Sequence, residues 1–182
     1  MIRKTSHLLI IIIFQLATLP VARAIDNETW LDISDIGVTT LMTSAMLVPS
    51  VQGDWEGTKQ AFYSIGFTHG ISILTKSLVH AKRPDLSDNN SFPSGHTASS
   101  FSSATTLYRR YGWEIGFPAY ALATLTGSAR VAGRKHHWYD ALAGAALGSA
   151  SGWYFTDALD ETVELYPWVD TKSAGIAFVY HW

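Results

Sequence analysis

The sequence predicts an all-α fold, a bundle of about five to six helices followed by a short C-terminal β-hairpin. One observation behind this prediction is a series of uncharged stretches of 15 to 18 residues, several of them rich in alanine and leucine, between turn or charge clusters. Such stretches are longer than typical strands, which favours helices. The other is an alternation of large apolar with smaller or polar residues after Asp160, which is the periodicity of a strand.

Residues 1–24 have the features of a secretory signal peptide. A basic start precedes an apolar stretch over residues 8–16, and Ala22-Arg23-Ala24 fits a signal-peptidase site. The apolar stretch is shorter than the roughly 20 residues of a spanning helix, which favours a cleaved signal over an uncleaved anchor. The sequence therefore predicts an exported protein whose mature chain begins at residue 25.

Residues 25–160 form the predicted helical domain. After a polar lead-in over residues 25–35, the expected helical segments are 36–53, 60–75, 97–108, 115–129 and 141–156. The last segment carries Gly144, Gly148 and Gly152 at intervals of four, so one helix face lets a neighbouring backbone approach closely. Glycine faces occur in membrane helices and in tightly packed soluble bundles, and the sequence leaves both open.

Residues 161–182 are expected to form a C-terminal extension. Ile176, Phe178, Tyr180 and Trp182 alternate with smaller or polar residues. Together with residues 162–168 this pattern predicts a hairpin after the bundle.

Charge and cysteine content exclude several classes of function. Without residues 1–24 the chain keeps ten basic and 15 acidic residues, a net charge of −5, which argues against a nucleic-acid partner. The chain has no cysteine, which excludes a disulfide framework, a thiolate metal site and a lipoprotein anchor. An exported chain without disulfides suits a bacterial periplasm or the periplasmic face of a membrane.

The first of three informative clusters is Lys76 with Arg83 and Pro84. A spacing of seven residues is two helical turns, so we expect both cations on one helix face, with Pro84 ending the helix just beyond them. Two cations on one face can clamp an anion. The same spacing is also common on solvated helix faces, so this cluster alone is a weak signal.

The second cluster is Pro93-Ser94-Gly95-His96, at the expected start of a helix. Ser94 can cap that helix, and the free backbone amides of its first turn, next to Gly95, offer a site for an anion. His96 then stands beside the anion, where it can donate a proton to a leaving oxygen. The alternative is an ordinary capped helix with an incidental histidine.

The third cluster is Arg130, His136 and Asp140. His136 and Asp140 are four residues apart, so on a helix the carboxylate can hold one imidazole nitrogen. The other nitrogen is then unprotonated, as a nucleophile or a metal ligand requires. Arg130 adds a planar fork suited to phosphate oxygens. A structural His–Asp pair on a helix surface is the alternative.

An anion site fits these clusters better than a metal site. None of the histidine pairs in this region has the spacing of a zincin helix, and the basic residues nearby would repel a cation. We therefore expect no metal and no other cofactor. His80 and His137 are expected to be bystanders.

Together the three clusters resemble the signature of the type 2 phosphatidic acid phosphatase superfamily, which includes lipid phosphatases, class A acid phosphatases and vanadium haloperoxidases. The signature combines Lys-x6-Arg-Pro, Pro-Ser-Gly-His and Ser-Arg-x5-His-x3-Asp, in this order. It spans residues 76–140, about a third of the chain. Ala129 stands at the position of the family serine, although Ser128 precedes it, and this removes one hydroxyl near the phosphate.

The resemblance implies a metal-independent phosphatase. His136 would attack phosphorus in line, held by Asp140, and His96 would protonate the departing alkoxide and later take a proton from the hydrolytic water. The groups that would neutralise the equatorial phosphate oxygens are Lys76, Arg83, Arg130 and the amides around Ser94 and Gly95.

The function expected from this resemblance is hydrolysis of phosphate monoesters or pyrophosphates of lipids at the periplasmic side of the envelope. The uncharged helices, the glycine face and an aromatic content of 13% favour a membrane-associated enzyme. The Ser- and Thr-rich segment 97–108 favours the alternative, a soluble periplasmic acid phosphatase acting on small phosphomonoesters. A vanadate-dependent haloperoxidase is less favoured because that branch has much longer chains. A binding module without activity is disfavoured because both histidines of the signature are intact.

Overall fold

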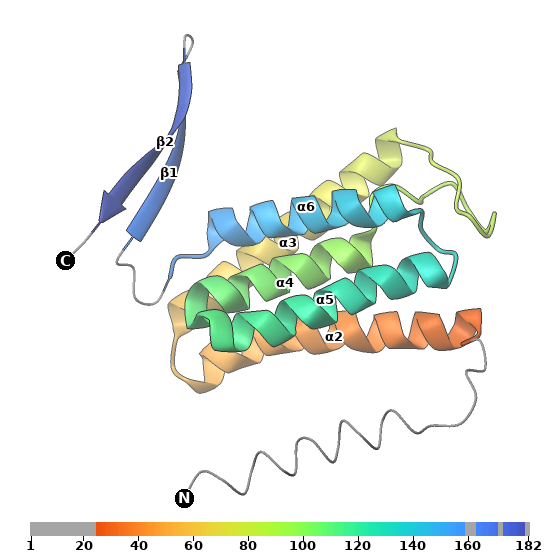
Figure 1. Ribbon diagram of the computed structural model, residues 1–182, viewed down its shortest axis with the longest axis horizontal. Helices are drawn as coiled ribbons and strands as arrows, with labels where there is room; N and C mark the ends of the chain where they lie inside the picture. The colour runs from red at the N-terminus through yellow and green to blue at the C-terminus, as the bar shows by residue number, and fades with distance from the viewer. Residues whose placement is uncertain (1–24, 159–162, 171–172, 181–182) are drawn as a thin grey trace, which may run out of the picture.

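The computed structural model describes residues 25–158, 163–170 and 173–180 (Figure 1). The predicted signal peptide, residues 1–24, lies outside these ranges. The described residues contain five helices: α2 (Asn27–Val51), α3 (Trp55–Leu78), α4 (Gly95–Tyr111), α5 (Trp113–Ala132) and α6 (Trp138–Phe155). The all-α bundle predicted from the uncharged stretches is therefore confirmed.

Helix α2 corrects the expected polar lead-in, because the helix already begins at Asn27. Asp26 caps it by accepting a hydrogen bond from the backbone N–H of Thr29 at 2.7 Å. Charged and polar side chains up to Asp35 therefore lie on a helix and not in an extended lead-in. The earlier start of α2 matters for the site, because it places Asp35 within the helix.

Two strands follow the bundle, β1 (Val163–Asp170) and β2 (Ser173–Tyr180). They pair antiparallel, with Val163 opposite Tyr180 and Asp170 opposite Ser173. Among the described elements these strands contact each other and none of the helices. The residues that line the candidate site all belong to the bundle and its connections.

Helix α4 is the centre of the bundle and packs against each of the other four helices (Figure 1). Its inward residues are mostly serine, threonine and alanine, so neighbouring helices approach it closely. The apolar core lies mainly on its α2, α3 and α5 sides and consists of Leu41, Ala45, Ala61, Ile65, Ala104, Leu107, Ala119 and Ala123. The Ser and Thr hydroxyls of α4 thus lie inside the bundle.

The glycine face of α6 packs directly on the backbone of α4, as the intervals of four predicted. A Cβ on Gly148 would lie 2.1 Å from the carbonyl oxygen of Ala98, and one on Gly144 would lie 2.5 Å from that of Ser94. Both contacts are to backbone atoms that cannot rotate away. This packing brings the first turns of α4 and α6 side by side at one end of the bundle.

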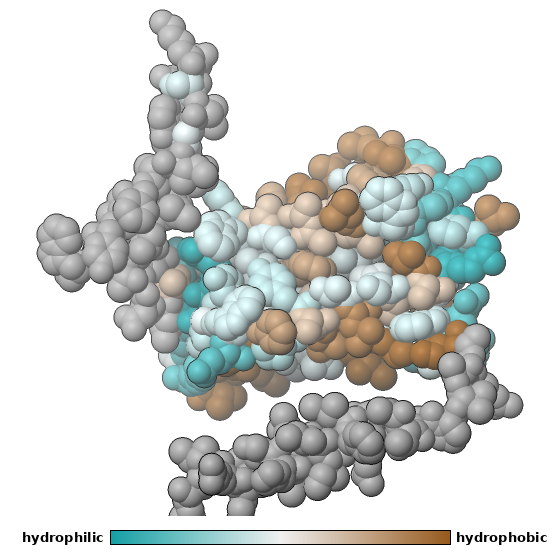
Figure 2. Space-filling view, in the orientation of Figure 1, coloured by the Kyte–Doolittle hydropathy of each residue, from teal (hydrophilic) through white to brown (hydrophobic). Residues whose placement is uncertain are grey.

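The outer surface of the bundle carries many large apolar side chains along the helices. Phe62 is 62% exposed, Leu78 is 72% exposed and Leu142 is 62% exposed. On the face shown in Figure 2, hydrophilic residues gather mainly at the two ends of the bundle. Within the described residues, α2 is the one helix whose length and composition would allow it to cross a membrane.

Candidate active site

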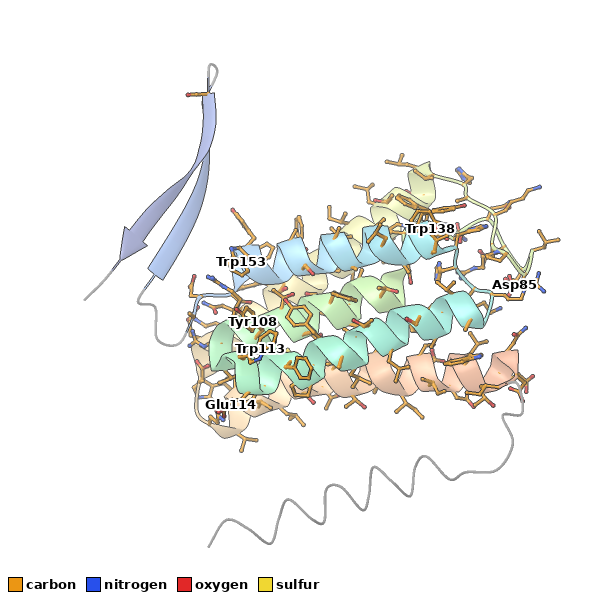
Figure 3. All side chains as sticks on the ribbon, in the orientation of Figure 1. Asp85, Tyr108, Trp113, Glu114, Trp138 and Trp153 are labelled. Carbon is orange, nitrogen blue, oxygen red and sulfur yellow. The ribbon has the colours of Figure 1, made fainter. Side chains whose placement is uncertain are left out.

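A cavity of about 410 Å³ opens at the end of the bundle where α3 and α5 finish and α4 and α6 begin. Figure 3 labels Trp138, the first residue of α6, and Asp85 at this end. Six of the eight predicted site residues line the cavity: Lys76, Arg83, Gly95, His96, Arg130 and His136. The other two, Ser94 and Asp140, are fully buried behind it. Residues from all three sequence clusters thus meet at one place.

Lys76 lies in the last turn of α3, and its ammonium group is held by the loop that follows. Nζ donates to the carbonyl oxygens of Asn90 and Pro93, both at 2.7 Å. Burial lowers the pKa of Lys76 to about 8, and the positive charge of Arg83 contributes to this shift. The lysine is therefore a cation at neutral pH that has lost much of its hydration.

The expectation that Lys76 and Arg83 share a helix face is wrong, because α3 ends at Leu78. Arg83 lies in the connection between α3 and α4, so its direction is set by loop contacts. Its Nε donates to the carboxylate of Asp88 at 2.7 Å, and its Nη1 donates to the carbonyl oxygen of Lys135 at 2.9 Å. The two cations converge on the cavity through backbone carbonyls and not through helical periodicity.

Ser94 is the N-cap of α4, as predicted. Its Oγ accepts from the backbone N–H of Thr97 at 3.5 Å and lies 2.8 Å from the Thr97 hydroxyl. Its own N–H donates to the carbonyl oxygen of Asp140 at 3.0 Å, which ties the start of α4 to the start of α6. Gly95 and His96, the next two residues, face the cavity.

His136 precedes α6 and does not lie on it, since His137 is the N-cap and Trp138 the first helical residue. Its Nδ1 lies 2.7 Å from the carbonyl oxygen of Ser91, and a carbonyl can only accept, so Nδ1 carries the proton. Nε2 is then the unprotonated nitrogen, and Arg83 Nη1 lies 3.3 Å from it. This tautomer is the one that a nucleophilic Nε2 requires.

Burial is the main reason that the pKa of His136 falls to about 3, and the charges of Arg83, Arg130 and Lys76 add to the shift. The side chain is only 2% exposed. At neutral pH the imidazole is therefore neutral and its Nε2 lone pair is available, whereas an imidazolium could not act as a nucleophile.

The expectation that Asp140 holds His136 by a direct hydrogen bond is wrong. Asp140 Oδ2 is 3.8 Å from His136 Nδ1, which is too long for a hydrogen bond. The carboxylate accepts instead from the backbone N–H of His137 at 2.8 Å, as in a helix cap, and from the hydroxyl of Ser91. Because the Ser91 carbonyl holds His136, Asp140 orients the imidazole through one intervening residue. Nothing in the sequence pattern pointed to Ser91.

His96 has an acidic partner that the sequence analysis also missed. Its Nε2 lies 2.9 Å from Oδ1 of Asp35, on α2. Arg130, in the last turn of α5, lies close to the same helix, with Nη1 3.3 Å from the Ser34 hydroxyl and 3.6 Å from Asp35 Oδ1. No local spacing links α2 to α4 or α5, so only the fold brings these groups together.

The cavity is an anion site by charge. The residues that line it include a lysine, two arginines and three histidines but no aspartate or glutamate. In the described part of the chain, no group of three or more His, Asp or Glu side chains is arranged to hold a metal ion. A tetrahedral oxyanion therefore fits the donors that face the cavity.

The departure from the signature at Ala129 is not offset by its neighbour. Ala129 is fully buried, and Ser128 is exposed and lines a separate groove beside Trp138 and Leu142. The hydroxyl that the signature places next to Arg130 is thus absent from the cavity.

The chain is similar to known proteins in sequence and in fold. The PAP2 superfamily matches residues 54–163. Lipid A 4'-phosphatase from Helicobacter pylori is 31% identical over 156 residues, which are 82% of this chain and 72% of that protein. Lipid A 1-phosphatase from Porphyromonas gingivalis is 40% identical over 74 residues, which are 38% of this chain and 16% of that longer protein.

Two solved structures share the fold at 20% sequence identity. LpxE from Aquifex aeolicus superposes with a TM-score of 0.63, covering 80% of this chain and 93% of its own. The first transmembrane PAP2 type phosphatidylglycerolphosphate phosphatase from Bacillus subtilis superposes with a TM-score of 0.59, covering 78% of this chain and 79% of its own. The family match begins at residue 54, so α2 with its Asp35 lies outside it.

Proposed function

The chain belongs to the PAP2 superfamily, and from this premise we propose that it hydrolyses phosphate monoesters or pyrophosphates of lipids through a phosphohistidine on His136. The observation that carries the proposal is the cavity itself. It combines three cations, no lining carboxylate, and an imidazole whose Nε2 is unprotonated. A phosphoryl group is the anion that such a set can both bind and transfer.

In the proposed first step, His136 Nε2 forms a bond to phosphorus while the bond from phosphorus to the leaving oxygen breaks on the opposite side. His96 gives its proton to that oxygen, so the alcohol leaves neutral. In the second step a water attacks the same phosphorus, His96 takes a proton from the water, and the N–P bond breaks. Inorganic phosphate leaves and both histidines return to their starting states.

The cations stabilise the charge that spreads over the three equatorial oxygens. Arg83 and Arg130 offer planar forks, and Lys76 offers a point charge. Their positions are fixed before substrate binds, by Asn90 and Pro93 for Lys76 and by Lys135 for Arg83. Preorganised donors of this kind contribute roughly 3 to 4 kcal/mol each when they are removed singly.

A lipid substrate is supported by a second, apolar cavity that adjoins the first. This cavity of about 350 Å³ lies between α2 and α3 and is lined by Met42, Met46, Phe62, Ile65, Gly66 and His69. Met42 and His69 also line the cationic cavity, so the two spaces share a wall. A molecule with a phosphate at one end and an acyl chain beside it fits this pair of cavities.

The names of the relatives and the exposed apolar side chains support the same substrate class. Both relatives are named as lipid A phosphatases, and we propose a phosphorylated lipid as the substrate here, met at the periplasmic side of a membrane. The hydroxyl-rich α4 favoured a soluble enzyme from sequence alone. Because those hydroxyls lie in the core, they no longer argue for a polar surface.

The test is to trap the intermediate on the full-length protein in lipid vesicles. Lipid substrates labelled in the phosphoryl group should yield inorganic phosphate and, after a rapid quench, an acid-labile protein phosphate at His136. Turnover should persist in EDTA, because the proposed chemistry needs no metal. Release of phosphate from small esters but not from lipids would contradict the substrate class, and a label on another residue would contradict the nucleophile.

A further inference from the structure

Helix α2 reaches the active site with two consecutive polar side chains. Asp35 Oδ1 lies 2.9 Å from His96 Nε2 and 3.6 Å from Arg130 Nη1, and the buried Ser34 hydroxyl lies 3.3 Å from the same Nη1. Asp35 is 60% exposed, so it stands at the rim of the site and not behind it. The family model matches residues 54–163 and the three sequence clusters span residues 76–140, so neither includes this carboxylate.

The surroundings of His96 are otherwise cationic or neutral. Arg130 approaches from α5, Arg83 from the loop after α3, and Lys76 from the end of α3. The two remaining titratable groups at this cavity are His69 on α3 and His136 before α6. Among the described residues, Asp35 supplies the sole carboxylate within ion-pair distance of His96.

We propose that Asp35 is a positioning residue for the general acid, stabilising the protonated form of His96 and fixing the orientation of its ring. This inference rests on the proposed phosphatase function. An imidazolium has two N–H groups, and Asp35 accepts from Nε2–H. The other proton, on Nδ1, is then the one that passes to the leaving oxygen. After transfer His96 is neutral and keeps its Nε2–H on Asp35.

The Asp35 carboxylate affects the pKa of His96, because it opposes the other influences on that imidazole. Burial and the charge of Arg130 lower the pKa of His96 below its ordinary value, and Asp35 acts against both. Without Asp35 the imidazole would lose its proton at a lower pH and would be a weaker acid catalyst at neutrality. A half-exposed ion pair contributes little to folding stability, so the effect should be found in the pH dependence of the reaction.

The experiment compares Asp35→Asn with wild type in full-length protein. The measurement is kcat/KM against pH for an alkyl phosphate and for p-nitrophenyl phosphate. With the alkyl phosphate, the alkaline limb of the profile should lie about one pH unit lower in Asp35→Asn than in the wild type. At pH values above this limb, kcat/KM should therefore be about tenfold lower than in the wild type. With p-nitrophenyl phosphate the change should be small, because nitrophenolate leaves without a proton. Asp32→Asn, an exposed carboxylate on the same helix, is the matched control and should leave both profiles unchanged.

A direct readout separates this inference from the function on which it rests. The ring signals of His96, assigned with His96→Gln, should titrate at lower pH in Asp35→Asn, whether or not any substrate is turned over. Asp35→Glu keeps the charge and should restore part of the shift. Unchanged titration of His96, or equal losses on both substrates with an unmoved limb, would overturn the positioning role. Failure of the proposed function would instead show as no phosphate release by the wild type.

Discussion

The two ends of the bundle use arginine in opposite ways. At the site end, Arg83 and Arg130 face a cavity that no carboxylate lines. Figure 3 labels Tyr108, Trp113 and Trp153 at the other end. There the guanidinium of Arg110 donates two hydrogen bonds, of 2.7 and 2.5 Å, to the carboxylate of Asp54, and we call this the closed end. Arg83 and Arg130 also have carboxylate neighbours, at 2.7 and 3.6 Å, but neither carboxylate lines the cavity. The difference teaches that arginines can bind an anion where part of the guanidinium faces a cavity without a carboxylate.

The closed end has the features of a structural cluster. Asp54 also caps α3 by accepting from Gly57 N–H at 2.9 Å, and it accepts from the Tyr111 hydroxyl at 3.1 Å. The Arg110 hydrogen bonds hold the pKa of Asp54 at about 2, and burial raises the pKa of Tyr111 to about 12. Asp54 thus accepts from Arg110, Gly57 and Tyr111 together, and the cluster ties the start of α3 to the end of α4.

The largest expected effect is at the site end. His136→Ala should lower kcat on every substrate by at least about a thousandfold, because a covalent nucleophile is lost. Its thermal stability at neutral pH should fall, since the variant loses the hydrogen bond from Nδ1–H to the Ser91 carbonyl and leaves a buried cavity. Steady-state kinetics and calorimetry on one preparation measure both. A variant with more than about a tenth of the wild-type rate contradicts the nucleophile.

His96→Ala should sharpen the distinction between attack and proton donation at the same end. We expect a loss of about a hundredfold on an alkyl phosphate but a much smaller loss on p-nitrophenyl phosphate, whose leaving group needs no proton. Comparing kcat/KM for the two substrates, with His136→Ala as the variant that loses both alike, is the measurement. Equal losses for His96→Ala would show a purely Coulombic role.

Disrupting the ion pair between Asp54 and Arg110 at the closed end should lower stability and leave activity almost unchanged. Asp54→Ala leaves the partly buried Arg110 without its partner and removes the cap of α3, so unfolding should become easier by about 3 kcal/mol. The kcat/KM of the protein that remains folded should change less than twofold. Denaturant titration and an activity assay at low temperature separate the two quantities. An unaltered denaturation midpoint would show that this ion pair does not stabilise the fold.

The two ends of the bundle should lose their contributions to folding stability over different pH ranges. His136 has a folded pKa of about 3 against an ordinary 6.5, so its contribution to stability is present above 6.5 and is lost as pH falls toward 3. Asp54 has a folded pKa of about 2 against 3.8, so its contribution is lost only as pH falls from 3.8 toward 2. His136→Gln should therefore flatten the fall in Tm between pH 6.5 and 4 and leave the lower range unchanged. A parallel fall in both proteins over the upper range would contradict the assignment.

Sequence reasoning located the helices and most of the site but not the contacts that orient it. Uncharged stretches bounded by turns predicted α2 to α6 because burial of a helix requires such stretches. Spacing arguments failed at Arg83 and His136, since both assumed a continuous helix where the chain forms a loop. Ser91 and Asp35 were missed for another reason. Their contacts to His136 and His96 join segments that are distant along the chain, and no local periodicity records such a pair.

The close packing of the glycine face of α6 on α4 leaves no space for larger residues, whereas other parts of the bundle can accept substitutions. Gly144 and Gly148 leave no room for another atom against α4. Helix α4 carries Gly95 and His96, and His136 lies two residues before the start of α6. A Cβ at Gly66 or Gly70 on α3 would meet nothing within 4 Å. Laboratory evolution of this scaffold toward new substrates should therefore collect its substitutions along α3 and its border with α2. The α4–α6 pair should stay invariant, because it sets the spacing between the nucleophile and the acid.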